Sequence, residues 1–264
     1  MITSTRNPKI QRVRLLQART RQRRQEGAFV IEGVRLGEEA LRSGWGAQLV
    51  LHTADLDERG QALVAGFAAR GVEIELVAGH VMKAASDTQT PQGALIVLNM
   101  QPLPLPAAPS LVFIPDGVRD PGNLGGMLRS AAAAGAQVAL LPPGTADPYA
   151  PKVLRAAMGA HFRLPLQTAD WREIRRRLEG WGLQVFLAEA ATGLLYTQAD
   201  LRTPLALIVG GEAAGAGAEA LALDPVRLHI PMQGWVESLN AAAAAAVLLF
   251  EIDRQRRELA GQAE

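Results

Sequence analysis

The segment Leu205-Ala-Leu-Ile-Val-Gly-Gly-Glu212 decides the fold that the sequence predicts. Its first five residues are apolar without interruption. This is typical of a strand in the centre of a parallel sheet, because helices cover such a strand on both faces. The strand runs into paired glycines and an acid, and glycines return at 215 and 217. Because glycine permits close approach of a ligand to the backbone, we expect a ligand site at the carboxyl end of this strand.

Strands and helices alternate on both sides of this segment. Apolar runs predict further strands at residues 111–117, 137–143, 184–190 and 226–234. Helical patterns lie between and after them, at residues 123–136, 148–159, 170–180 and 237–259. The last of these is rich in alanine, the strongest helix former. The alternation predicts a doubly wound parallel sheet.

A proline-rich segment separates this region from the start of the chain. Residues 101–109 alternate proline with apolar residues, which favours an extended, semi-rigid connector. Before it, apolar runs at 28–33, 48–53, 73–78 and 94–100 alternate with amphipathic helical patterns. The sequence therefore predicts a smaller α/β domain over residues 1–100, a linker over 101–109 and a larger α/β domain over 110–264.

The composition excludes several classes of protein. The 264 residues include no cysteine, so disulfides, thiolate metal sites and a cysteine nucleophile are ruled out. The four histidines lie far apart in the sequence, so we expect no metal site. We find no apolar signal-peptide core at the start, and no apolar run approaches the ~20 residues that span a bilayer. These features predict a cytoplasmic protein with no membrane segment.

Basic residues are concentrated at the start of the chain, although the net charge is only +1. Eight lysines and arginines precede the first acidic residue, Glu26. A basic arm of this kind can neutralise phosphates and release counterions, which indicates a nucleic-acid partner. The alternative is a solvated basic helix that binds nothing.

A polar segment, residues 116–129, follows the predicted strand at 111–117. Asn123 is positioned to cap the helix that comes next, and Gly125 and Gly126 leave its first turn bare. Such a helix start offers free amides and a positive dipole to an anion. Arg129 lies six residues beyond Asn123, so the two side chains are not on the same face of the helix. The alternative interpretation is an ordinary capped helix with a surface arginine.

The glycine-rich segment, residues 210–217, fits neither of two familiar nucleotide motifs. It is not a P-loop, because the lysine and Ser/Thr after the final glycine are absent. It is not the dinucleotide fingerprint, because the glycine spacing differs. The alternative interpretation of the segment is a flexible turn with a solvated glutamate.

The third polar segment, residues 229–240, joins a strand to the alanine-rich helix. Ile230, Met232 and Leu239 are apolar residues suited to wall a slot for a flat adenine ring. Ser238 and Asn240 stand at the entrance to the helix. The alternative is a helix cap with core contacts.

Together the three segments resemble the SpoU/TrmH family of RNA ribose 2′-O-methyltransferases, within the SPOUT superfamily. The motif N-x-G-x-x-x-R-x-A matches Asn123, Gly125, Arg129 and Ala131. The motif G-x-E-x-x-G matches Gly210, Glu212 and Gly215. The motif I-P-M-x-G-x-x-x-S-L-N matches Ile230, Pro231, Met232, Gly234, Ser238, Leu239 and Asn240. The similarity covers residues 110–255. One departure is the alanine-rich stretch 241–246, which we expect to change packing only.

A weaker similarity extends to the start of the chain. Ser4-x-x-Asn7-Pro8-Lys9 and Phe29-Val-Ile-Glu32-Gly33 resemble the RNA substrate-binding domain that many family members carry. That domain is similar to ribosomal proteins that bind kinked RNA. The resemblance favours ribosomal RNA over transfer RNA as the substrate.

The resemblance implies a parallel-sheet SPOUT domain with a C-terminal trefoil knot, a homodimer, and S-adenosylmethionine (AdoMet) as the cofactor. The residues that it implies for the cofactor pocket are Gly210, Gly211, Glu212, Ile230, Met232, Ser238 and Leu239. The residues that it implies for catalysis are Arg129, Asn123, Glu212, Ser238 and Asn240.

The chemistry of these side chains limits their roles. A guanidinium scarcely deprotonates, so we expect Arg129 to grip phosphate and stabilise developing negative charge rather than act as a base. Asn123 is expected to orient the ribose or Arg129, and Glu212 is an alternative proton acceptor. Ser238 and Asn240 are expected to bind RNA phosphate or the polar end of the cofactor.

Two other functions remain open. One is a catalytically inactive, RNA-binding relative of the family. The other is a nicotinamide-dependent oxidoreductase on a Rossmann sheet, which the missing dinucleotide fingerprint disfavours.

Overall fold

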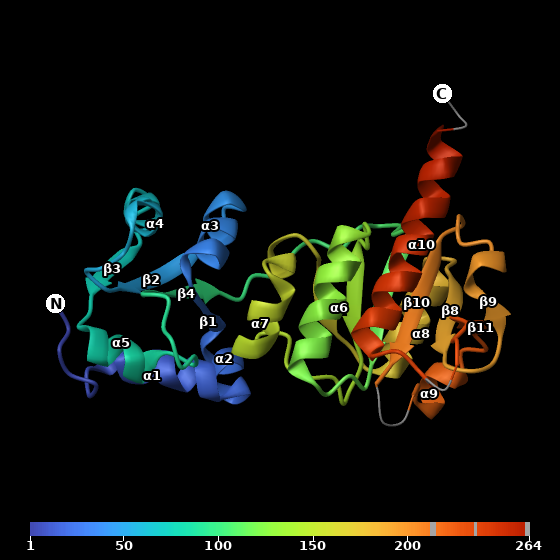
Figure 1. Cartoon of the computed structure of the whole chain (residues 1–264), viewed down its shortest axis with the longest axis horizontal. Coiled ribbons are helices and arrows are strands. Elements are labelled where there is room, and N and C mark those ends of the chain that lie inside the picture. Colours follow the sequence, from blue (N-terminus) through green and yellow to red (C-terminus); the bar gives the residue numbers. More distant parts are fainter. Residues whose placement is uncertain (212–214, 235–236, 262–264) are drawn as a thin grey trace. The chain divides into compact units, whose positions relative to one another are not determined.

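The chain divides into two compact units, each with its own sheet (Figure 1). The computed structural model describes residues 1–211, 215–234 and 237–261. Unit 1 comprises Met1–Pro102 and Asp147–Phe162, and unit 2 comprises Leu103–Ala146 and Arg163–Glu264. In the described part of the chain, no helix has both the length and the apolar character that a bilayer crossing requires.

Unit 1 is built on a mixed sheet in the order β1-β4-β2-β3, in which β4 is antiparallel to both neighbours and β2 is parallel to β3. The strands are β1 (Ala28–Glu32), β2 (Ala47–His52), β3 (Glu73–Leu76) and β4 (Ala94–Asn99). The helices in residues 1–102 are α1 (Pro8–Ala18), α2 (Thr20–Glu26), α3 (Val34–Arg42), α4 (Glu58–Ala68) and α5 (Gly79–Ala85). The expected small α/β fold is confirmed.

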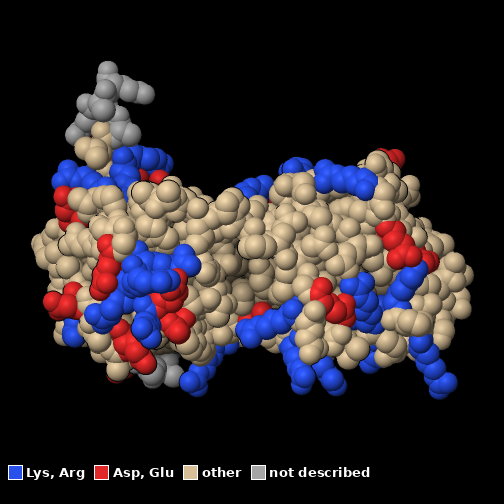
Figure 2. Space-filling view, turned by 180° about the vertical axis from the view of Figure 1, so that it is seen from behind, with Lys and Arg blue, Asp and Glu red and all other residues tan. Residues whose placement is uncertain are grey.

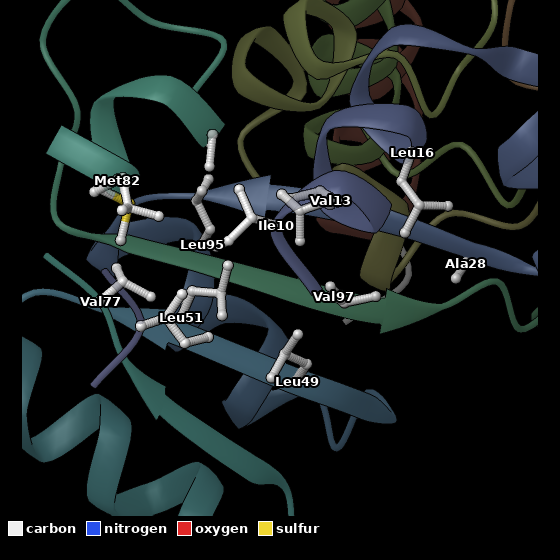
Figure 3. Close-up of a cluster of buried hydrophobic side chains, with 14 residues drawn as sticks. Ile10, Val13, Leu16, Ala28, Leu49, Leu51, Val77, Met82, Leu95 and Val97 are labelled. Atoms are coloured by element: carbon white, nitrogen blue, oxygen red, sulfur yellow. The ribbon is translucent and has the colours of Figure 1, made fainter. Parts of the chain in front are cut away.

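Helix α1 forms where the sequence suggested a basic arm. Asn7 caps it by accepting a hydrogen bond from the amide of Lys9 at 2.9 Å, and Pro8 takes the first helical position. Ile10, Val13 and Leu16 recur at helical spacing and are buried against one face of the sheet, where α5 also packs (Figure 3). The predicted arm is therefore two packed helices, α1 and α2.

Several of the basic residues in these helices are used within the protein. Lys9 pairs with Glu73 at 2.6 Å and also with Glu75. Arg12 pairs with Glu26 at 2.6 Å. The expected set of eight free phosphate-binding cations is therefore smaller than the sequence indicated.

Residues 147–162 pack in unit 1, although they connect two strands of unit 2. They form α7 (Pro151–Ala157) and a 3-10 turn (Ala160–Phe162). The ring of Tyr149 lies 4.9 Å from that of Phe29, and the ring of Phe162 lies 5.2 Å from that of Trp45. This segment thus completes the hydrophobic core on one side of β1.

A buried ion pair fixes this segment to α2. Arg23 is only 3% exposed, and its Nε donates to Asp147 at 3.0 Å. Its Nη1 donates to the carbonyl oxygens of Leu16 and Gln17 at 2.6 and 2.9 Å. Burial alone raises the pKa of Asp147, but the hydrogen bonds and charge of Arg23 outweigh burial and lower it. Both charges are therefore kept inside the unit.

Unit 2 contains a wholly parallel sheet in the order β7-β6-β5-β10-β8-β11-β9. Its strands are β5 (Leu111–Asp116), β6 (Val138–Leu141), β7 (Leu166–Thr168), β8 (Gln184–Glu189), β9 (Leu194–Leu195), β10 (Leu205–Gly210) and β11 (Val226–His229). The predicted central strand is β10, whose residues 205–209 are at most 2% exposed. The predicted parallel sheet is confirmed. The strands β7 and β9, which the sequence analysis missed, have only three and two residues.

Helices cover both faces of this sheet. Helices α6 (Pro121–Ala133) and α10 (Ala241–Gly261) contact each other and the strands β5 and β10 (Figure 1). Helices α8 (Trp171–Gly180) and α9 (Ala218–Leu221) contribute Ile174, Leu178 and Ala220 to a core with Ile114 and Ile208. Because side chains alternate along a strand, the intervening residues of β5 and β10 face α6 and α10.

We predict that Asp147→Asn destabilises unit 1 strongly. The change leaves Arg23 buried without a counter-charge, which typically costs ~3–5 kcal/mol. The matched control is Asp87→Asn, because Asp87 pairs with Arg155 at 2.9 Å in an exposed position. Exposed pairs contribute ~0–1 kcal/mol. The measurement is the free energy of unfolding in urea, and equal losses in the two variants would contradict the prediction.

The contribution of Asp147 to the stability of unit 1 depends on pH. The pKa of Asp147 is lowered in the folded state, so its stabilisation is present above the unfolded value of ~3.9 and is lost as the pH falls through the folded value. Asp147→Asn is therefore expected to lose less stability on acidification than the wild type.

Candidate functional site

A cavity of about 400 Å³ opens at the carboxyl ends of β8, β10 and β11. This volume is within the ~300–1,000 Å³ range of small-molecule sites. The residues that line it are Ala188, Glu189, Ala190, Val209, Gly210, Gly211, Gly215, Leu228, Ile230, Met232, Ser238, Leu239, Asn240, Ala241, Ala244 and Leu248. The cavity therefore lies where the sequence predicted a ligand site.

The structure gathers residues from two of the three motifs around this cavity. Of the residues expected to hold a cofactor, Gly210, Gly211, Ile230, Met232, Ser238 and Leu239 all line it. Asn240, expected in catalysis, lines it as well. Glu212 lies outside the described residues. Asn123 and Arg129 are not among the lining residues.

Glycine is required at the end of β10 because other backbone segments approach it closely. A Cβ atom on Gly210 would lie 2.3 Å from the carbonyl carbon of Gly215. A Cβ atom on Gly211 would lie 2.7 Å from the carbonyl oxygen of Gly117. Such distances are far below van der Waals contact, so a side chain at either position would displace the backbone that forms the site.

The side chain of Asp116 holds the glycine-rich segment in place. Asp116 ends β5 and is 5% exposed, and its Oδ2 accepts a hydrogen bond from the amide of Gly217 at 2.6 Å. Burial raises the pKa of Asp116, although the Gly217 amide partly offsets that rise. Sequence analysis assigned no role to Asp116, which stands at the end of the predicted strand 111–117. The signal for its positioning role was the acid at the end of a buried strand.

The expected cap of α6 is wrong. Asp120 caps the helix, because its Oδ1 accepts from the amide of Asn123 at 2.8 Å and Pro121 takes the first helical position. Asn123 therefore lies in the first turn, not before it. The Asp120-Pro121 pair is itself a helix-start signal, since proline is favoured at the first position.

Asn123 and Asn240 join the first motif to the third. The Nδ2 of Asn240 donates to the Oδ1 of Asn123 at 3.0 Å. The Oδ1 of Asn240 accepts from the amide of Ala242 at 2.9 Å. Asn240 thus caps α10, which begins at Ala241 rather than at the predicted residue 237.

Arg129 lies in the third turn of α6 and is exposed. Midway between Asn123 and Arg129 is Gly126, where an added Cβ would lie 3.5 Å from the Cβ of Ala242. Asn123 and Arg129 are each three residues from Gly126, which places each of them about 60° to one side of it around the helix axis. The two side chains therefore flank the side of α6 that meets α10. In the part of the chain that the structure describes, no hydrogen bond or ion pair engages the Arg129 guanidinium.

Sequence analysis missed two groups of cavity residues. Ala188 and Glu189 reach the cavity because β8 lies between β10 and β11 in the sheet, an order that local patterns do not specify. Ala241 and Ala244 line it from α10. Their small side chains leave room for the cavity, so the alanine-rich stretch shapes the site as well as the packing.

Family models account for most of the chain. Residues 110–250 match the model of the SpoU rRNA Methylase family. The chain belongs to the SpoU rRNA methylase family. Residues 7–95 match the MRM3-like substrate binding domain. Family membership thus extends over the unit that contains the cavity and is accompanied by a second recognisable module in unit 1.

Near relatives of this SpoU family member match over almost their whole length. The 23S rRNA (guanosine(2553)-2′-O)-methyltransferase RlmP of Bacillus subtilis (strain 168) is 33% identical, with 95% of this chain and 98% of the relative covered. The AdoMet-bound rRNA methyltransferase from Sinorhizobium meliloti is 31% identical with a TM-score of 0.85, covering 96% of this chain and 97% of that chain. The SpoU methyltransferase AviRb from Streptomyces viridochromogenes, in complex with AdoMet, is 27% identical with a TM-score of 0.81, covering 96% of this chain and 100% of that chain.

We predict that Asp116→Ala loosens the glycine-rich segment, whereas Asp116→Asn keeps it in place. Alanine removes the acceptor for the Gly217 amide, and the loss of one such hydrogen bond costs ~0.5–1.5 kcal/mol. Asparagine retains an acceptor oxygen and removes the cost of burying a charge. The measurements are the free energy of unfolding and the hydrogen-exchange rate of the Gly217 amide. Equal exchange rates in the two variants would show that the side chain does not anchor the segment.

The contribution of Asp116 to stability also depends on pH, because its pKa is shifted in the folded state. Because the folded-state pKa of Asp116 is raised, the stabilisation that it contributes is present at low pH and is lost as the pH rises through that value. Asp116→Asn is therefore expected to gain stability relative to the wild type as the pH increases.

Proposed function

We propose that the protein transfers a methyl group from AdoMet to a ribose 2′-hydroxyl of ribosomal RNA. The observation that carries this proposal is the cavity at the end of β10, which brings the glycine-rich motif and the Ile-Pro-Met motif of a SpoU family member together. Two relatives of nearly equal length are AdoMet complexes, and the Bacillus subtilis relative is a 23S rRNA 2′-O-methyltransferase.

The cavity has the chemistry that AdoMet requires. Ile230, Met232 and Leu239 provide apolar surface for the adenine ring. Gly210 and Gly211 add backbone rather than side chains to the wall of the cavity. The hydroxyl of Ser238 is suited to the polar end of the cofactor. When bound, the cofactor supplies an electrophilic methyl group on its sulfonium sulfur.

Residues of α6 and of the start of α10 are suited to handle the RNA. As the ribose oxygen attacks, an oxygen–carbon bond forms, the carbon–sulfur bond breaks and the hydroxyl proton must leave. The exposed Arg129 grips an RNA phosphate and stabilises the negative charge on the attacking oxygen. Asn123, held by Asn240, orients the ribose or Arg129. Glu212 is the candidate proton acceptor.

Unit 1 binds the RNA in this proposal. Its match to a substrate-binding domain and the exposed Arg14, Arg19, Arg21 and Arg24 of its first helices support the assignment. Figure 2 shows Lys and Arg side chains gathered in several places on one face of the molecule. Since α7 packs in unit 1, residues 1–102 and 147–162 are the RNA-binding body, rather than residues 1–100 alone.

We also propose the knot and the homodimer. The strand order β10-β8-β11 and the family resemblance support a trefoil knot around the cavity, against the general rarity of knots. Val247 and Phe250 lie three residues apart on α10 and are 36% and 45% exposed. Large apolar side chains exposed on one helix face support a contact with a second copy of the chain.

Two measurements test the proposed activity. Calorimetry is expected to show binding of AdoMet or its demethylated product and none of a nicotinamide cofactor. Single-turnover reactions with labelled AdoMet and ribosomal RNA are expected to place the label on a ribose 2′-oxygen. Cofactor binding without transfer would indicate an inactive relative, and binding of nicotinamide alone would reject the proposal.

Arg129→Ala is expected to slow methyl transfer ~10²–10³-fold, as for the loss of one preorganised charge-stabilising donor. Cofactor affinity is expected to stay near the wild-type value, because Arg129 does not line the cavity. Arg129→Lys is expected to restore little activity, since it keeps the charge but loses the bidentate geometry. Single-turnover rates at saturating cofactor provide the measurement. A normal rate for Arg129→Ala would make Arg129 an ordinary surface residue.

A further inference from the structure

Unit 1 contains a second cavity, of about 530 Å³, which we name the edge pocket. It is lined by Val34, Thr53, Asp55, Leu56, Asp57, Gly79, Met82, Lys83, Pro91, Gln92 and Gly93. The carboxyl ends of β1, β2 and β3 and the amino end of the antiparallel β4 meet here, at one edge of the sheet. The motif Phe29–Gly33, which resembles part of an RNA substrate-binding domain, ends beside this pocket.

Residues 86–93 run along one side of the edge pocket and are held by hydrogen bonds. Glu32 accepts hydrogen bonds through Oε1 from the hydroxyls of Ser86 and Thr88, both at 2.7 Å. The segment is joined to the sheet where the amide of Thr53 donates to the carbonyl of Gly93 at 3.0 Å. A Cβ on Gly33 would lie 2.0 Å from Oε1 of Gln92, so the Gln92 side chain lies directly over this glycine.

The charges that line the pocket disfavour a simple anion. Two carboxylates, Asp55 and Asp57, stand against one ammonium group, Lys83. Asp57 is occupied as the cap of α4, where its Oδ1 accepts from the amide of Gly60 at 2.8 Å. A hydrogen bond with Thr53 lowers the pKa of Asp55, so that carboxylate is a charged acceptor at neutral pH. The preferred ligand therefore presents N–H donors together with an apolar face.

We propose that the edge pocket receives one unstacked base of the RNA substrate, with guanine preferred. This proposal rests on the proposed function, because it assigns a contact to the same RNA. Sequence-specific RNA recognition uses splayed-out bases that are held by their faces and read at their Watson–Crick edges. Val34, Leu56 and the thioether of Met82 provide the apolar contact.

The preference for guanine follows from its hydrogen-bonding edge. Guanine presents two adjacent N–H donors, which match the two oxygens of the Asp55 carboxylate. Its O6 acceptor matches the amide N–H of Gln92 or the ammonium of Lys83. Uracil presents a single N–H between two carbonyl oxygens, so it would place an acceptor against a carboxylate.

The first test uses mononucleotides and the full chain. Guanosine monophosphate is expected to shift the NMR signals of the Gly79 and Gly93 amides, uridine monophosphate is expected to shift them much less, and inorganic phosphate is expected to leave them unchanged. Equal responses to all three probes, or no response to any, would overturn the proposal.

The second test measures affinity for ribosomal RNA. Asp55→Asn and Gln92→Ala are each expected to weaken RNA binding about 10-fold, the scale of a lost bidentate base contact. The matched control is Glu58→Gln, which removes a neighbouring exposed carboxylate that does not line the pocket. Removing a carboxylate near RNA reduces charge repulsion, which by itself tightens binding. Weaker binding by Asp55→Asn is therefore explained only by the loss of a direct contact.

Further readouts separate this proposal from the proposed function. The dependence of affinity on salt is expected to be unchanged in Asp55→Asn, because no phosphate contact is lost. Its melting temperature and AdoMet affinity should equal those of the wild type. If Asp55→Asn binds RNA as tightly as the wild type, and the wild type transfers methyl groups normally, only the proposal for the edge pocket is overturned. Absence of methyl transfer by the wild type would overturn the function instead.

Discussion

The close approach of backbone segments to the end of β10 is the constraint on which the candidate site depends. Gly210 and Gly211 have no side chains, so the backbone at Gly215 and Gly117 packs directly against the strand end. Asp116 secures the arrangement from the neighbouring strand through its bond to Gly217. Any larger residue at Gly210 would occupy the space of this backbone, and the floor of the cavity would be lost.

The second element of the site is the contact between α6 and α10. Asn240 caps α10 with one side-chain atom and binds Asn123 of α6 with another. Gly126 and Ala242 are small enough for the two helices to meet closely beside this bond. Asn123 and Arg129 therefore lie on a helix that packs against α10, and α10 contributes Ala241, Ala244 and Leu248 to the cavity, which fixes the geometry between them.

Unit 1 shows that a compact body need not be continuous in sequence. Its core includes Tyr149 and Phe162, which reach it from a connection between two strands of the other sheet. The buried pair of Arg23 and Asp147 adds a charge-assisted link to the same segment. A cut after the proline-rich linker would therefore remove partners from the segment 147–162.

The sequence by itself determined the parallel sheet, the central strand β10 and the three motifs, because uninterrupted apolar runs and glycine spacing are local signals. It also determined seven of the sixteen residues that line the cavity, since these motif residues follow directly on those strands. The tertiary structure alone decided that β8 lies between β10 and β11, which brings Glu189 to the cavity. It alone decided that residues 147–162 pack in unit 1. Both outcomes depend on pairing between segments far apart in the chain, and a local pattern carries no information about which distant surface it will meet.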